Sequence, residues 1–138
     1  NQLCEMYTEY WFTHPCHRLL NNQINAGGSA YRYQLGRRSP MEQFGCTHAA
    51  DIGYVFGTTD DEFHGQAPRV SQLINEIQSS WAAFAHNDTP ATSENPWPSY
   101  DQGWCFMLFD HECSYLVEHN PNPIDFWSRI SDQKLASF

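Results

Sequence analysis

The chain contains Gly45-Cys46-Thr47-His48-Ala49-Ala50-Asp51-Ile52-Gly53-Tyr54-Val55-Phe56-Gly57, which sets a histidine in a turn of small residues. An acid, Asp51, follows three positions later, and an aromatic and β-branched run then ends in glycine. Small neighbours let a substrate or another protein group come close to the imidazole ring. Imidazole is the side chain whose unperturbed pKa, ~6.5, suits proton transfer near neutral pH. The stretch therefore predicts a loop that presents His48 as a proton shuttle.

Composition limits the class of protein. A length of 138 residues fits one ordinary domain. Aromatic residues make up 15% and charged residues 17%, which argues against disorder over most of the length. The formal charge of -9 and the isoelectric point near 5.0 argue against nucleic acid as a partner, because nucleic acid selects basic surfaces. No apolar run reaches the ~18 residues of a membrane span, so we expect none.

The order of elements predicts an α/β chain with few strands. Periodicity and turn residues predict a helix over 1–26 interrupted near Pro15, a strand over 30–35, a helix over 71–86, strands over 105–109 and 114–117 with a turn at 110–112, and a short helix over 124–130. The polar stretches 36–45, 58–65 and 89–98 read as loops. Three strands make a thin sheet for a chain of this length. We therefore expect the sheet to be part of a larger one.

The helix predicted over 71–86 carries a stripe of large apolar side chains. These are Leu73, Ile77, Trp81 and Phe84, at spacings that place them on one helix face. Such a stripe indicates a core face rather than a ligand site. The acidic run Asp60–Glu62 is interpreted as part of a solvated loop.

Several blocks of this chain resemble, in the correct order, the type-B carboxylesterase and cholinesterase family. The stretch around His48 is similar to the family's G-x-x-H-[GA]-x-[DE]-[IL]-x-[YF]-[VL]-F-G, with a Y-x-Y strand before it at 31–33. The family's W-x-x-F-A, W-P-x-Y and F-W blocks resemble residues 81–85, 97–100 and 126–127. The ordered set covers nearly the whole chain. It corresponds to about the last quarter of the family's domain.

The resemblance implies an α/β-hydrolase fold of which residues 1–138 form one C-terminal piece. A missing or separate N-terminal chain would then complete the sheet. It also implies that His48 is the general base of a Ser-Glu/Asp-His triad, and that Asp51 supports the loop instead of being the triad acid. No G-x-S-x-G nucleophile motif occurs in the chain. The serine, the triad acid and the oxyanion hole are therefore expected from that N-terminal partner.

The cysteines indicate an oxidising compartment. Cys4, Cys16, Cys46, Cys105 and Cys113 lack C-x-x-C spacing, so they suit disulfides better than zinc. Because five is odd, at least one is expected to be free or bonded to another chain. For Cys46 two interpretations stand side by side: a disulfide partner that pins the histidine loop, and a small buried thiol.

Other features also favour secretion. Asn87-Asp88-Thr89 is a glycosylation sequon, although Pro90 weakens it, so Asn87 is a candidate glycosylation site. The sequence starts at Asn1, without an initiator methionine or a signal-like apolar segment, and we expect a processed product or a piece of a longer polypeptide.

Two groups of histidine and cysteine raise the question of a metal site. They are His14, Cys16 and His17 near the start, and His111 with Cys113. Neither group has a matching ligand pair at zinc-finger spacing. We interpret these histidines as ordinary surface or helix-end residues and expect neither a metal nor a cofactor.

Three functions from different classes follow from these observations. The first is the C-terminal chain of a secreted serine esterase that acts on a small-molecule or lipid ester together with its N-terminal partner chain. The second is a catalytically inactive, cholinesterase-like module for adhesion or assembly. The third is a small binding domain that folds alone, against which the thin sheet and the isolated triad member argue.

Overall fold

A computed structural model describes residues 2–100, 105–117, 126–127 and 129–130. These residues fall into two compact units. One holds the described residues of Asn1–Ala30 and Glu118–Phe138, and the other is Tyr31–Val117. No helix in the described ranges is long and apolar enough to cross a membrane.

The first unit is built on a helix with a π-helical turn in its middle. Helix α1 covers Gln2–Thr8, the π-helical turn covers Glu9–Thr13, and α2 covers His14–Asn25. The predicted interruption near Pro15 is thus a widened turn that precedes the proline. Pro15 is the second residue of α2 and has no N–H to donate to the turn before it, which is where the helix widens.

One face of α2 is buried, and it carries His14, His17 and Leu20 at three-residue intervals. The expectation that His14 and His17 are surface or helix-end residues is therefore wrong, because His14 is 4% and His17 0% exposed. The two histidines lie on the inner stripe of the helix with a leucine. Cys16 lies between them and is exposed.

Within the first unit, Trp127 contacts the N-terminal helix. Its ring lies 5.3 Å from that of Tyr10, and its indole N–H donates to the Glu9 carboxylate over 3.2 Å. Phe126 and Trp127 are helical, in agreement with the helix predicted over 124–130. Most of that predicted helix lies outside the described residues.

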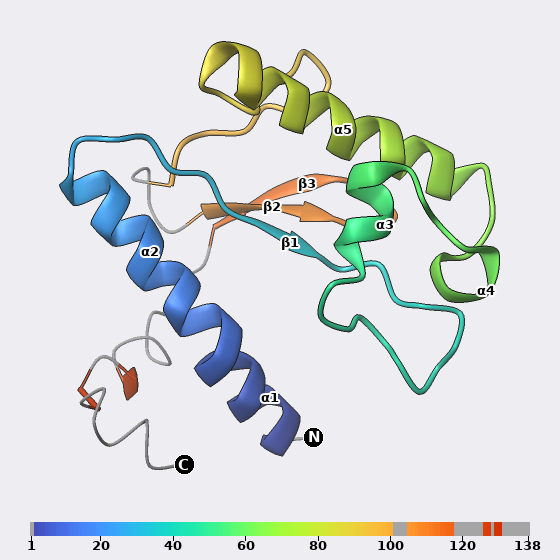
Figure 1. Ribbon diagram of the computed structural model, residues 1–138, viewed down its shortest axis with the longest axis horizontal. Helices are drawn as coiled ribbons and strands as arrows, with labels where there is room; N and C mark the ends of the chain where they lie inside the picture. The colour runs from blue at the N-terminus through green and yellow to red at the C-terminus, as the bar shows by residue number, and fades with distance from the viewer. Residues whose placement is uncertain (1, 101–104, 118–125, 128, 131–138) are drawn as a thin grey trace. The chain divides into compact units, whose positions relative to one another are not determined.

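The described residues of the second unit form a three-stranded sheet in the order β1-β2-β3 (Figure 1). Strand β1 covers Tyr33–Leu35, β2 covers Cys105–Phe109 and β3 covers Ser114–Val117. β1 is parallel to β2, and β2 forms an antiparallel hairpin with β3. The two later strands have the predicted bounds. β1 is shorter than predicted because the regular ladder begins only at Tyr33, opposite Met107.

Helix α5, Arg69–Asn87, packs on one face of this sheet (Figure 1). Its buried stripe meets the side chains that alternate inward along β2, since successive residues of a strand point to opposite faces. The buried core consists of Tyr54, Val70, Leu73, Ile77, Trp97, Met107 and Phe109. The core prediction holds for Leu73 and Ile77. It is wrong for Trp81 and Phe84, which are 47% and 46% exposed.

Two short helices follow His48 where no helix was predicted. Helix α3 covers Asp51–Phe56, and α4 covers Asp61–His64 within the predicted loop 58–65. The backbone N–H of Phe63 donates to the Asp60 side chain over 2.9 Å, which caps the start of α4. α3 ends at Gly57, whose left-handed φ of 66° closes the helix.

α3 and α4 are joined by a close approach at Gly53. A Cβ placed on Gly53 would overlap Nε2 of the His64 ring. That ring is held by Tyr54, 5.1 Å away between centroids, and by its Nδ1, which accepts from the backbone N–H of Asp60 over 3.0 Å. Glycine is therefore needed at position 53 for the two helices to meet.

We expect Gly53→Ala to lower the free energy of unfolding by about 1–3 kcal/mol, the usual range for an overpacked site. Urea denaturation followed by circular dichroism measures the change. Removing the imidazole with His64→Ala in the Gly53→Ala background should recover part of the loss, which a double-mutant cycle would report as coupling. Additive effects of the two substitutions would show that the His64 ring does not fill this space.

Candidate active site

His48 lies on the turn between β1 and α3, at Thr47–Ala50. The loop that holds it leaves the carboxyl end of β1, and β2 runs parallel to β1, so both strands end at the same edge. Open α/β sheets bind ligands outside the carboxyl ends of their strands. His48 is exposed there. The structure thus places the predicted proton shuttle at the edge of the sheet where such folds do their chemistry.

The residue after the histidine has an uncommon backbone conformation. Ala49 adopts φ of 66°, which costs a non-glycine residue of the L series roughly 1–2 kcal/mol. Ala50 then donates its N–H to the Thr47 carbonyl over 3.3 Å and closes the turn. The strain is offset by contacts on both sides of the turn.

The first of these contacts is made by Asp51. The hydroxyl of Tyr33 donates to Oδ2 of Asp51 over 2.6 Å, across 18 residues of sequence. The bond ties the first turn of α3 to β1. It fits the expectation that Asp51 supports the loop, and that role stays a prediction. Tyr33 itself was missed as a site residue, because its only signal in the sequence was its place in the Y-x-Y strand.

The second contact is made by Cys46. Its Sγ donates to the Leu35 carbonyl at the end of β1 over 2.7 Å. Burial of the sulfur, and then the Asp110 carboxylate, raise the pKa of this thiol. Cys46 is exposed as a residue and forms no disulfide with another cysteine of this chain. A disulfide between Cys46 and another chain stays a prediction. Cys46 and Asp51, which lie on either side of His48 in the sequence, are therefore each hydrogen-bonded to β1.

All five cysteines are reduced in this structure. Cys4, Cys16 and Cys46 are exposed, Cys105 is buried and Cys113 is partly buried. No two of these five, each within the described ranges, form the disulfide that the sequence predicted. Cys105 instead donates to the Ser99 carbonyl over 3.3 Å.

Cys113 belongs to a charged cluster between α5 and the turn that joins β2 to β3. Its thiol donates to Oε2 of Glu76 over 2.8 Å, and Glu76 forms an ion pair with Arg69 at 3.2 Å. Arg69 also donates to the Asp110 carbonyl. Burial, and then the Glu76 carboxylate, raise the pKa of Cys113 from 9.0 to about 11. The cluster ties the hairpin turn to the helix and favours the protonated form of the thiol.

The remaining residues singled out in the sequence, His111 and Asn87, make no contact with His48 that the structure records. His111 is exposed and contacts the Arg37 guanidinium at 3.0 and 3.1 Å. Asn87, the candidate glycosylation site, is exposed at the last position of α5. No cluster of three or more histidine, cysteine or acidic side chains suited to a metal occurs in the part of the chain that the structure describes.

Comparison with known sequences identifies the family to which the chain belongs. Residues 1–127 match the carboxylesterase family. The chain belongs to this family. Carboxylesterase 4A of Bos taurus is 25% identical over 112 residues, which are 77% of this chain and 20% of that protein. The probable N-octanoylanthranilate hydrolase AqdA2 of Rhodococcus erythropolis is 31% identical over 97 residues, 64% of this chain and 20% of that protein. The chain thus spans about a fifth of these relatives' length.

Solved esterases share the fold of this carboxylesterase-family chain. An esterase from Clostridium hathewayi that hydrolyses aliphatic aromatic polyesters has a TM-score of 0.72 at 18% identity, over 93% of this chain and 29% of that one. A PNB esterase has a TM-score of 0.63 at 22% identity, over 73% of this chain and 22% of that one. The predicted fold class is confirmed: the chain is part of an α/β-hydrolase fold.

The raised pKa of Cys113 allows the role of Glu76 in the charged cluster to be tested. At pH 8, a thiol with a pKa of about 11 forms about a hundredfold less thiolate than one with a pKa of 9.0. The more basic thiolate is more nucleophilic, but only by about tenfold, so the net reaction is slower. We expect iodoacetamide to modify Cys113 at least about tenfold more slowly than exposed Cys4, as read by peptide mass spectrometry. Glu76→Gln should speed the reaction of Cys113, because it removes a carboxylate that raises the pKa. An unchanged rate in that variant would contradict the role of Glu76.

Proposed function

We propose that this chain is the C-terminal section of a secreted serine hydrolase that acts on carboxylic esters, with His48 as its general base. The observation that carries the proposal is the exposed His48 on a loop held at the carboxyl end of β1 in a member of the carboxylesterase family. The substrate is a small-molecule or lipid ester. The exposed sequon at Asn87 supports the secreted location.

The proposed reaction assigns two proton transfers to His48. As a serine hydroxyl attacks the ester carbonyl carbon, the imidazole accepts the hydroxyl proton. It then gives that proton to the departing alkoxide, which leaves as the alcohol while an acyl-serine remains. In the second half, the imidazole takes a proton from water, the hydroxide oxygen attacks the acyl carbon, and the proton returns to the serine.

The serine, the triad acid and the oxyanion hole belong to a further polypeptide in this proposal. The chain has no G-x-S-x-G motif and spans about a fifth of its relatives. Large exposed apolar side chains also indicate surface meant for burial, since soluble monomers rarely expose wide apolar patches. On the N-terminal helix these are Leu3, Met6, Tyr7, Trp11, Phe12 and Leu19, all 45–71% exposed.

The first prediction concerns the base. In the enzyme assembled from this chain and the section that carries the serine, His48→Ala should lower kcat for p-nitrophenyl acetate by about 10⁴-fold or more. The matched control is His86→Ala, which removes an exposed histidine from the last turn of α5 and should leave kcat unchanged. Hydrolysis that survives His48→Ala would refute the role of His48 as base.

A fluorophosphonate probe distinguishes the esterase from the inactive adhesion module. The probe should label the serine of the partner section and leave this chain unlabelled. An assembled protein that neither reacts with the probe nor hydrolyses esters would favour the adhesion module instead.

The second prediction concerns how the base is positioned. Tyr33 acts on the loop through Asp51, so Tyr33→Phe keeps the ring but removes the 2.6 Å bond. A hydrogen bond to a charged group contributes about 1.5–3 kcal/mol, and we expect kcat to fall roughly tenfold. KM should change less than about twofold, because Tyr33 does not touch the substrate in this mechanism. Tyr31→Phe, which removes a hydroxyl from the same strand region, is the control that should keep kcat.

A further inference from the structure

Two consecutive arginines, Arg37 and Arg38, stand on the segment that leads from β1 to the histidine loop. Arg37 is partly buried, and its guanidinium contacts the His111 ring at 3.0 and 3.1 Å. Arg38 is exposed, and within the described part of the chain its guanidinium forms no ion pair and no hydrogen bond. The first arginine is therefore engaged in the fold, whereas the second is available to a ligand.

The Arg38 guanidinium lies against Gly45, the first residue of the histidine stretch. A Cβ placed on Gly45 would lie 3.4 Å from a terminal nitrogen of this guanidinium and 3.7 Å from its central carbon. The backbone N–H of Ser39 donates to the Gly45 carbonyl over 2.7 Å, which holds the segment with Arg38 beside the loop. Gly45 precedes His48 by three residues, so their Cα atoms are at most about 11 Å apart.

Two acidic side chains lie in the same neighbourhood without pairing with Arg38. Burial raises the pKa of the Cys46 thiol most, the Asp110 carboxylate raises it further, and the Arg38 charge opposes both. Asp51 also acts on this thiol. Each carboxylate accepts a different hydrogen bond, Asp51 from the Tyr33 hydroxyl over 2.6 Å and Asp110 from a backbone N–H over 2.8 Å. The charge of Arg38 thus stays without a direct counter-charge.

The chemistry of this group indicates the kind of ligand it would take. A guanidinium is a planar fork of N–H donors that matches the two oxygens of a carboxylate. The chain has seven lysine and arginine residues against 16 aspartate and glutamate residues, so an unpaired cation is not a general property of its surface. Arg38 also follows the carboxyl end of β1, where open α/β sheets bind ligands.

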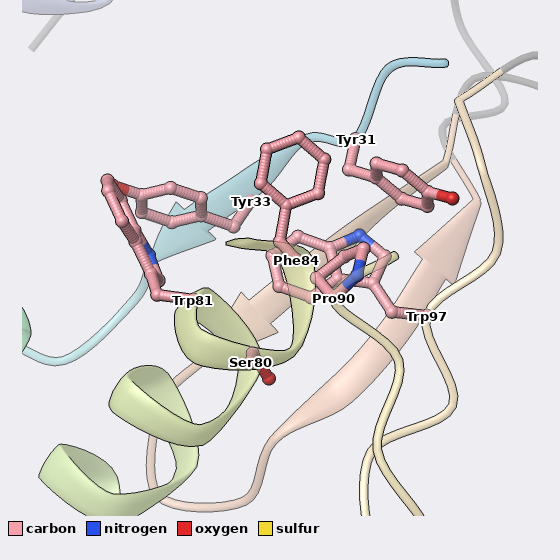
Figure 2. A pocket seen from close by; sticks show the side chains of 7 residues that line it. All are labelled: Tyr31, Tyr33, Ser80, Trp81, Phe84, Pro90 and Trp97. Atoms are coloured by element: carbon pink, nitrogen blue, oxygen red, sulfur yellow. The ribbon is translucent and has the colours of Figure 1, made fainter. Parts of the chain in front are cut away.

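The apolar pocket beside α5 offers no alternative place for a carboxylate. The pocket measures about 180 Å³, and tyrosine, tryptophan and phenylalanine rings form most of its wall, as Figure 2 shows. No basic residue is among the described residues that line it. An ionised group buried against such walls without a partner would carry a large desolvation cost. A negatively charged part of a ligand is therefore excluded from this pocket.

We propose that Arg38 is a specificity residue that selects esters carrying a carboxylate. Its guanidinium binds that carboxylate while the ester carbonyl lies at His48, with a chain of several methylenes between the two groups. This rests on the proposed function, because it assigns a substrate class to that same site.

The test compares two esters in the enzyme assembled from this chain and the section that carries the serine. p-Nitrophenyl hydrogen adipate has a terminal carboxylate where p-nitrophenyl hexanoate has a methyl group. Arg38→Gln should lower the ratio of their kcat/KM values, charged over neutral, by about tenfold or more at low ionic strength. Arg38→Lys should retain part of this ratio, because it keeps the charge but not the planar fork. The matched control is Arg129→Gln, which removes another exposed arginine and should keep the ratio.

Salt gives a second readout of the same contact. Since exposed charges are screened at high ionic strength, about 0.5 M NaCl should lower the ratio in the unsubstituted enzyme and change it less in Arg38→Gln. A ratio that Arg38→Gln leaves unchanged would overturn the proposal. An equal loss of kcat/KM with both esters would show that Arg38 only supports the loop, and would overturn it as well.

Binding of adipate tests the site without catalysis. When this chain carries ¹⁵N-labelled arginine in the assembled protein, adipate should shift the Nε–H signal of Arg38 and leave that of Arg129 in place. An unshifted Arg38 signal, or equal shifts of both signals from unspecific binding of the anion, would overturn the proposal even if His48→Ala is inactive. A shift of Arg38 alone with an active His48→Ala enzyme would uphold the carboxylate site and refute the base.

Discussion

The contacts of Tyr33 join the core of the second unit to its histidine loop. The Tyr33 ring lies edge-on to Trp97 and Phe109, with centroids 6.3 and 5.8 Å away, while its hydroxyl donates to Asp51. Tyrosine suits this position because its body is apolar and its tip needs a hydrogen-bond partner. The packing of the core thus fixes the point from which the hydroxyl holds the loop. Since Asp51 is the first residue of α3, the same bond also ties the start of that helix to β1.

A second set of polar contacts holds the other side of the sheet edge. The turn after β2 is bound to α5 by Arg69 and Cys113, and Arg37 contacts His111 on the same turn. These groups come from segments far apart in the sequence, and they meet where β1 and β2 end. The carboxyl edge of the sheet is therefore held by hydrogen bonds and an ion pair, whereas its centre is held by apolar burial. The polar contacts thus lie at the sheet edge from which the loop with His48 starts.

The sequence predicted the elements whose signals are local. Residues 105–109 and 114–117 are two short runs of apolar and aromatic residues on either side of a polar turn, and α5 carries a long apolar stripe. The spacing of the apolar residues and the turn residues between them were therefore sufficient to predict these elements. Helices α3 and α4 were missed because each has only one or two turns, too short for periodicity to register. A stripe shows which face of a helix is apolar but not what covers it, and for that reason Trp81 and Phe84 were misplaced in the core. The burial of His14 and His17 likewise depends on tertiary contacts.

The sequence singled out His48 as the candidate residue, whose role stays a prediction, but it gave no sign of the contacts that hold its loop. His48 stood out from the small residues around it and from the family resemblance, while the Tyr33 to Asp51 bond spans 18 positions without a motif. This support bears on how a divided triad can operate. Serine and histidine need only hydrogen-bond distance, not a continuous chain, but each ordering step at assembly costs conformational entropy. In the proposed enzyme, a loop already held to β1 by Cys46 and Asp51 needs less ordering when the section that would carry the serine binds.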